Sequence, residues 1–208
     1  MANYKEYGWQ DESFTHAHNY LIPSILEVLE GTEGPILDVG CGNGAVANFL
    51  IEKGFDAYGT DLSKKGIEVA NKINKGRFYL QDVEKDEIPD KLKEIPFKTI
   101  ISTEVIEHLY DPRSYIKFCK QVLESNGCGK LIISTPYHGY LKNLALALTG
   151  KMDQHFTVLW DGGHIKFWSY QTLKTVLEEF SFDVIKFKGS GRIPYLWKSM
   201  IVVAEYKP

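Results

Sequence analysis

Two carboxylates and one imidazole lie close together in the segment Thr103-Glu104-Val105-Ile106-Glu107-His108. In a helical turn, Glu104, Glu107 and His108 are spaced i, i+3 and i+4 and project to one side. Such a group can bind a divalent metal ion, or it can provide a general base, His108, that nearby acids such as Glu107 orient. A purely structural hydrogen-bonding role is the third interpretation. An imidazole with an ordinary pKa near ~6.5 accepts a proton at neutral pH.

A glycine-rich loop, Asp38-Val39-Gly40-Cys41-Gly42-Asn43-Gly44, provides a second chemical signal. Three glycines at alternate positions let the backbone approach a ligand closely. Gly40, Gly42 and Ala45 also match the dinucleotide pattern GxGxxA, which is weak without its context. Asp61 follows Gly40 by 21 residues, and a carboxylate there can accept both hydrogen bonds of a ribose diol. The sequence therefore predicts a pocket for a nucleotide or nucleoside.

Two further polar positions favour S-adenosylmethionine over NAD as the ligand of this pocket. Asp38 precedes the glycines, and Gln81-Asp82 ends the third expected strand; a zwitterionic amino acid and an adenine need such partners. An NAD(P)-linked oxidoreductase is the first alternative, but Tyr115 is followed by Cys119 where short-chain enzymes need Tyr-x-x-x-Lys, and Tyr170–Lys174 comes late in the chain. A non-catalytic nucleoside-binding protein is the second alternative.

Short β-like apolar runs alternate with longer helical stripes along the chain, which predicts a doubly wound α/β sheet with helices on both faces. We expect one domain over residues 1–208, with an N-terminal helical cap over 1–33. Within the cap, residues 14–29 are helical with a break at Pro23. The stretch 137–163 interrupts the alternation and reads as a lid-like insertion. The expected strands are 35–39, 57–60, 77–80, 97–103, 130–134, 184–188 and 198–206.

Charge and composition exclude several classes of protein. The 208 residues include 24 Lys+Arg and 27 Asp+Glu, and 44% are apolar. Disordered, collagen-like and basic nucleic-acid-coating proteins do not fit, so we expect a small-molecule partner and no nucleic acid. No apolar run exceeds five residues, so no membrane span is expected, and residues 1–5 lack a signal-peptide core. The absence of a CxxC motif indicates a reducing, cytoplasmic location, with the three cysteines Cys41, Cys119 and Cys128 unpaired.

From about Gly34 to Ala204 these motifs resemble the class I S-adenosylmethionine-dependent methyltransferases. The resemblance implies a Rossmann-like seven-stranded sheet whose last strand is antiparallel, and S-adenosylmethionine as cofactor. Residues 38–44 resemble the first motif of this family, Asp61 its ribose-binding acid, and Asp82 its adenine-side acid beside the apolar Val83. The cofactor-binding residues that it implies are Asp38, Gly40, Cys41, Gly42, Gly44, Asp61, Leu62, Asp82, Val83 and Thr103.

The segment 104–112, Glu-Val-Ile-Glu-His-Leu-Tyr-Asp-Pro, resembles the ubiquinone-biosynthesis O-methyltransferases of the methyltransferase type 11/12 group. It is also similar to the Glu-x-x-Glu-His metal motif of small-RNA 2′-O-methyltransferases, which fit less well because the chain has no basic cluster. Both families have a further downstream histidine, here His164. The resemblance thus implies Mg²⁺ bound by Glu104, Glu107, His108 and His164, as the alternative to His108 as a metal-free base.

The same resemblance implies methyl transfer to a hydroxyl of an aromatic or quinol-like acceptor. It also implies peripheral membrane contact through the insertion 137–163, for which an ordinary packed lid helix is the alternative. Arg192 could orient an acidic group of the substrate, although a surface arginine is the simpler interpretation. No pattern in the sequence indicates an oligomeric state.

Overall fold

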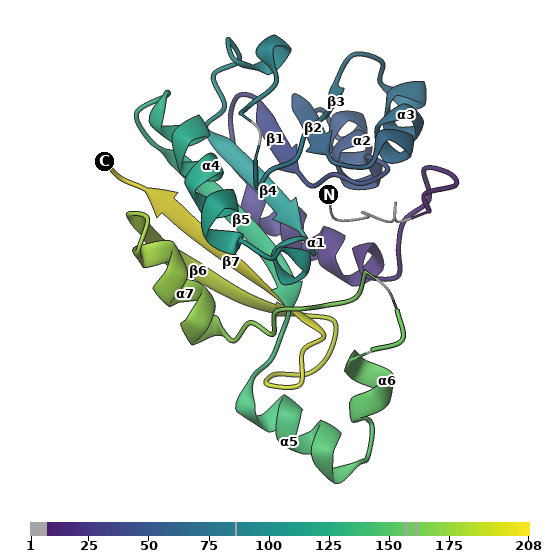
Figure 1. Ribbon diagram of the computed structural model, residues 1–208. Helices are drawn as coiled ribbons and strands as arrows, with labels where there is room; N and C mark the ends of the chain where they lie inside the picture. Colours follow the sequence, from purple (N-terminus) through teal and green to yellow (C-terminus); the bar gives the residue numbers. More distant parts are fainter. Residues whose placement is uncertain (1–7, 86, 157, 161) are drawn as a thin grey trace.

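The computed structural model describes residues 8–85, 87–156, 158–160 and 162–208 (Figure 1). The expectation that residues 1–5 lack an apolar leader lies outside these residues. The strands are β1 (Ile36–Val39), β2 (Ala57–Asp61), β3 (Phe78–Leu80), β4 (Thr99–Thr103), β5 (Gly129–Pro136), β6 (Phe182–Ser190) and β7 (Ser199–Tyr206). The helices are α1 (His18–Leu29), α2 (Ala45–Glu52), α3 (Lys64–Ile73), α4 (Pro112–Glu124), α5 (Tyr140–Leu148), α6 (Met152–Phe156) and α7 (Tyr170–Glu178), with 3₁₀ turns η1 (Asp90–Leu92) and η2 (Ile106–His108).

The strands form one seven-stranded sheet in the order β3-β2-β1-β4-β5-β7-β6. β7 runs antiparallel to both β5 and β6, whereas the strands from β3 to β5 are parallel. The predicted doubly wound sheet with an antiparallel last strand is therefore confirmed. The chain moves outward from β1 to β3 and then returns to the other side of β1 as β4. Open α/β sheets bind ligands at such a reversal, beyond the carboxyl ends of the strands.

Helices cover both faces of the sheet, with α1, α2 and α3 on one face and α4 and α7 on the other (Figure 1). All four residues of β1 are buried, as expected for a parallel strand covered on both sides. α4 begins at Pro112 because the Asp111 side chain accepts a hydrogen bond from the Ser114 N–H at 3.0 Å. Its apolar stripe packs into the core with the residues Tyr115, Phe118, Cys119, Val122 and Leu123.

The N-terminal segment differs from the prediction in two respects. α1 begins at His18 rather than at residue 14, and it continues through Pro23 without a break. Proline inside a helix costs about 3 kcal/mol, but Leu21, Ile25 and Leu29 are buried on the same helix. Each buried apolar side chain contributes about 1.5–3 kcal/mol. Packing against the sheet therefore outweighs the lost backbone hydrogen bond.

The insertion 137–163 contains α5 and α6, which extend beyond one end of the sheet, next to the loop between β6 and β7 (Figure 1). The apolar residues of α5 are not all buried, since Tyr140 is 79% and Leu148 78% exposed, whereas Lys142 is only 5% exposed. The Lys142 ammonium donates to the Lys198 carbonyl at 3.0 Å. Within the described part of the chain, no helix is long and apolar enough to cross a membrane.

Candidate active site

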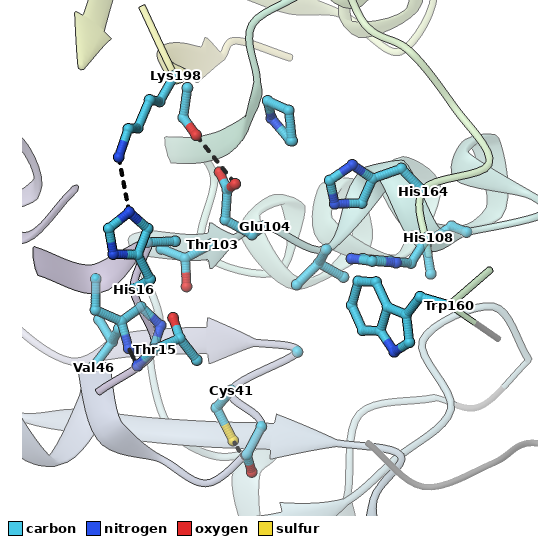
Figure 2. A pocket seen from close by; sticks show the side chains of 18 of the residues that line it. Thr15, His16, Cys41, Val46, Thr103, Glu104, His108, Trp160, His164 and Lys198 are labelled. Carbon is cyan, nitrogen blue, oxygen red and sulfur yellow. Dashed lines mark hydrogen bonds between the residues drawn. The ribbon is translucent and has the colours of Figure 1, made fainter. Parts of the chain in front are cut away.

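A cavity of about 1170 Å³ lies at the carboxyl ends of β1, β2 and β4 (Figure 2). The N-terminal segment, the insertion and the β6–β7 loop complete its walls. The expected site residues that line it are Gly40, Cys41, Gly42, Asp61, Leu62, Asp82, Val83, Thr103, Glu104, His108 and His164. The other three, Asp38, Gly44 and Glu107, do not line it.

The glycine loop is held close to its neighbours by backbone hydrogen bonds. The N–H groups of Gly40 and Cys41 both donate to the Thr60 carbonyl, at 2.8 and 2.9 Å. Gly40 has a φ of 78°, and a Cβ there would lie 2.5 Å from a methyl group of Val105. Gly44 has a φ of 75° and turns the chain into α2, where a Cβ would lie 2.5 Å from the Ala70 Cβ. Gly40 thus forms the floor of the cavity, and Gly44 allows the packing behind it.

Asp61 lies at the end of β2 with its carboxylate held by the loop. Oδ2 accepts from the Gly42 N–H at 2.8 Å, and Oδ1 accepts from the Ser63 N–H at 2.7 Å. Burial raises the pKa of Asp61, while these N–H groups and that of Leu62 lower it. Each carboxylate oxygen has about two acceptor sites, so both oxygens can also accept from a ligand hydroxyl. This geometry fits a ribose diol.

Asp38 lies behind the loop in β1 and is completely buried. Within the described part of the chain, neither of its carboxylate oxygens has a hydrogen-bond partner. Burial, followed by the charge of Asp61, raises the pKa of Asp38 to about 8. Asp38 does not line the cavity, so its assignment to the amino acid end of S-adenosylmethionine stays a prediction from the family resemblance.

The ligand-free protein should lose stability as the pH rises from about 4 to about 8, in part through Asp38. Its carboxyl group keeps a proton up to about pH 8 in the folded state but loses it near 3.8 when unfolded. The stabilisation is therefore complete below the unfolded value and is lost as the pH rises through the folded value. Asp38→Asn should flatten the curve of unfolding free energy by up to about 1.4 kcal/mol per pH unit. Urea unfolding at several pH values measures this.

The matched control for this titration is Asp183→Asn, at an exposed position in β6. Its curve should follow that of the unchanged protein. An unaltered pH dependence in Asp38→Asn contradicts the assignment of the titration to Asp38.

Glu104 does not lie in one helical turn with Glu107 and His108, contrary to the helical-turn hypothesis. Its φ of 55° breaks the helical path, and η2 begins only at Ile106. The Glu104 carboxylate accepts hydrogen bonds from the Ser134 hydroxyl at 2.9 Å and the Ser199 hydroxyl at 3.1 Å, the latter shown in Figure 2. Burial raises its pKa to about 7, although the two serines lower it.

Glu107, His108 and His164 are three of the four residues that were predicted to bind a metal ion, and their side chains form a cluster. One ligand atom from each lies within 4.8 Å of the others. Glu107 is buried and accepts from the Thr135 hydroxyl at 3.0 Å through Oε2, while Oε1 lies 3.9 Å from His108 Nε2. His164 follows the insertion and returns to this point, with its ring centroid 5.0 Å from that of His108. The cluster therefore contains three of the four expected ligands, without Glu104.

Both imidazoles of this cluster are neutral at pH 7. Burial lowers the pKa of His108, although the carbonyl of Gly163 opposes the shift, with its oxygen 3.2 Å from Nδ1. Burial, with His108 as a smaller cause, lowers the pKa of His164 to about 4. Neutral imidazoles can bind a metal ion or accept a proton, so both chemical interpretations fit the geometry.

Several cavity residues had no signal in the sequence. Tyr20 lies in α1, and its hydroxyl is 3.2 Å from the hydroxyl of Ser199, which begins β7. Trp9 lies against the loop, since a Cβ on Gly42 would meet its ring at 2.5 Å. Only the packing of α1 against β6 and β7 brings Tyr20 to Ser199. Arg192, which the sequence marked only weakly, also lines the cavity, together with His16, His155 and Trp160.

A family model described as a methyltransferase domain matches residues 14–186. The chain therefore belongs to this family, and it is a class I S-adenosylmethionine-dependent methyltransferase. This assignment favours the S-adenosylmethionine interpretation of the glycine loop over NAD(P).

Among known proteins, the chain is 33% identical over 118 residues to the ubiquinone biosynthesis O-methyltransferase of Pelagibacter ubique, an alignment that covers 55% of this chain and 47% of the relative. It is 28% identical over 169 residues to the same enzyme of a Ruegeria species, covering 78% of this chain and 66% of the relative. The chain thus spans about half to two thirds of the length of these curated relatives.

Solved structures show the same fold. The magnesium protoporphyrin IX methyltransferase (ChlM) of Synechocystis, solved with bound SAH, has a TM-score of 0.66 at 19% identity, covering 90% of this chain and 82% of that one. The methyltransferase domain of bacterial CtHen1 has a TM-score of 0.63 at 19% identity, covering 91% of this chain and 99% of that one.

Proposed function

We propose that the protein transfers a methyl group from S-adenosylmethionine to a hydroxyl oxygen of a small aromatic or quinol-like acceptor. The observation that carries this proposal is that a single cavity is lined both by the glycine loop with Asp61 and by the imidazole of His108. The names of the curated relatives support the same acceptor type. The exposed residues of α5 also fit peripheral contact of the insertion with a lipid surface.

In this proposal, one group of residues binds the cofactor and another accepts a proton from the acceptor hydroxyl. S-adenosylmethionine supplies an already activated methyl group, so the protein chiefly has to position the acceptor oxygen in line. The loop and Asp61 bind the nucleoside. In neutral His108, the proton on Nδ1 points to the Gly163 carbonyl, so Nε2 can accept the proton of the hydroxyl nucleophile. Such general-base catalysis contributes about 10²–10⁴ in rate.

Calorimetric titration with S-adenosylhomocysteine, NAD and NADP tests the cofactor part of the proposal. We expect saturable binding of S-adenosylhomocysteine and none of the dinucleotides, because Asp61 and the loop fit one ribose. A screen of hydroxylated aromatics with labelled S-adenosylmethionine then tests transfer. Binding of a dinucleotide instead would contradict the proposal, and tight cofactor binding without transfer to any acceptor would favour a non-catalytic nucleoside-binding protein.

A metal-assisted form of the reaction is the second candidate, and the cluster of Glu107, His108 and His164 favours it. One carboxylate and two imidazoles suit a borderline ion such as Mn²⁺ or Zn²⁺ better than Mg²⁺, which prefers oxygen ligands. An ion held there lowers the pKa of a hydroxyl group that it binds. The Thr135 hydroxyl donates a hydrogen bond to the Glu107 carboxylate and so orients Glu107 as a metal ligand.

If the metal site is used, a chelator should suppress methyl transfer at least about tenfold, and Mn²⁺ should restore it more fully than Mg²⁺. Initial rates after dialysis against EDTA measure this. His164→Ala should lose the response to added metal while keeping its affinity for S-adenosylhomocysteine. Activity that does not change on chelation leaves His108 as a metal-free base.

A further inference from the structure

The two ends of the cavity carry opposite charge. Acidic side chains lie at the end formed by β2 and β3, with the lining residues Asp61, Asp82 and Glu84. Basic side chains lie at the other end, contributed by the insertion and the β6–β7 loop, with the lining residues Lys142, Lys151, Arg192 and Lys198. These two segments lie side by side beyond one end of the sheet (Figure 1). The acidic end includes Asp61 of the proposed nucleoside site.

Lys142 is the most deeply placed of the basic residues. It is 5% exposed and projects from α5, where its ammonium donates one hydrogen bond, to the Lys198 carbonyl. An ammonium has three donors, and in the described part of the chain the other two have no acceptor. Burial, followed by the charge of Arg192, lowers the pKa of Lys142 to about 8, while the charge of Glu104 opposes this shift. A buried ammonium whose donors are not all satisfied is costly, and an anion beside it offsets that cost.

The loop between β6 and β7 adds Arg192 and Lys198. Gly191 has a φ of 90°, and a Cβ there would lie 2.9 Å from the Lys198 Cβ, so the loop folds tightly at this point. The Lys198 ammonium lies 2.8 Å from His16 Nε2, and a dashed line marks this interaction in Figure 2. Arg192 forms no hydrogen bond or ion pair with any described residue, although it lines the cavity.

The carboxylate that faces this basic end is that of Glu104. Both of its oxygens already accept serine hydroxyls, from Ser134 and Ser199, and burial raises its pKa to about 7. A single carboxylate does not balance four basic side chains. The basic end therefore has an excess of positive charge and of hydrogen-bond donors.

We propose that the basic end of the cavity binds an anionic group of the methyl acceptor, a carboxylate or a phosphate. This inference rests on the proposed methyltransferase function and narrows its substrate class to acidic acceptors. Arg192 presents a planar pair of donors suited to either anion, and Lys142 supplies two further donors from the opposite element. The acceptor is thereby anchored at one end, while its hydroxyl group lies toward His108.

The test is calorimetric, on the full chain saturated with S-adenosylhomocysteine. The probes are dihydroxybenzoate, its neutral isostere dihydroxybenzamide, and inorganic phosphate. We expect the benzoate to bind at least about tenfold more tightly than the amide. Arg192→Met and Lys142→Met should each abolish this preference, and the exposed Lys117→Met on α4 should keep it. If phosphate displaces the benzoate, the basic end binds a phosphate-type group. If phosphate does not displace it, the basic end binds a carboxylate.

Equal affinity for the acid and the amide would overturn the inference, as would unchanged preference in Arg192→Met, or binding of neither the benzoate nor phosphate. Lys142 is buried, so Lys142→Met could fail to fold. Arg192 is exposed, so in that case Arg192→Met alone tests the inference. The proposed function fails separately, if the unchanged protein does not bind S-adenosylhomocysteine at all.

Discussion

Asp61→Ala should lower the affinity for S-adenosylhomocysteine at least about a hundredfold. A hydrogen bond to a charged group contributes about 1.5–3 kcal/mol, and the ribose diol loses two of them. Two such losses, at least about 3 kcal/mol, correspond to a factor above a hundred in Kd. The same change removes the acceptor of the Gly42 and Ser63 N–H groups, so the loop itself is held less firmly. Calorimetric titration measures the effect.

Asp61→Asn and Asp183→Ala separate ligand binding from folding. The amide keeps one acceptor oxygen and the size of the side chain, so its affinity should lie between those of the alanine variant and the unchanged protein. Asp183 is exposed in β6, and its replacement should leave affinity unchanged. Near-normal affinity in Asp61→Ala, with a normal melting temperature, would exclude Asp61 as the ribose-binding residue.

His108→Ala should lower kcat about 10²–10⁴-fold, which is the usual contribution of a general base. The affinity for S-adenosylhomocysteine should change less than about twofold, because Asp61 and the loop hold the nucleoside. The pH profile provides a second readout. Burial lowers the pKa of His108 below its ordinary value of 6.5, so the rate should fall as the pH drops through that lower value, and this limb should vanish in His108→Ala.

His164→Ala distinguishes the two roles open to His108. If His108 acts as a metal ligand, both variants should lose activity to a similar extent, since they share the cluster. If His108 acts as a metal-free base, His164→Ala should keep most of the turnover and the acidic limb of the profile. Unchanged turnover in His108→Ala removes this residue from the mechanism.

Much of the fold could be predicted from local pattern. Parallel strands buried on both faces appear as short apolar runs, and helices appear as stripes, so the order of elements agrees with expectation. The antiparallel last strand agrees with what the family resemblance implied. The break at Pro23 is absent because the burial of Leu21, Ile25 and Leu29 was not visible in the local sequence. Local propensity predicts elements, and tertiary packing can override it.

The segment from Glu104 to His108 shows that helical spacing in the sequence does not by itself place side chains together. Glu104, Glu107 and His108 have helical spacing, yet the positive φ of Glu104 places its carboxylate on Ser134 and Ser199. Ser199 is 95 residues away in the chain, and no spacing rule connects the two. Three of the four side chains of the metal hypothesis do lie together, and the hypothesis did not anticipate the environment of the fourth. The metal itself stays a prediction.

The sequence by itself determined the cofactor half of the site. A glycine loop, the acid at the end of the next strand and their order along the chain are local features, because one βαβ unit contains them all. Only the tertiary structure decided the acceptor half. Lys142, Arg192 and Lys198 come from an insertion and a distant loop, and α5 buries its lysine while exposing its leucines, the reverse of what hydropathy predicts. Which side chains face a cavity depends on how separate segments pack, and that information is spread over the whole chain.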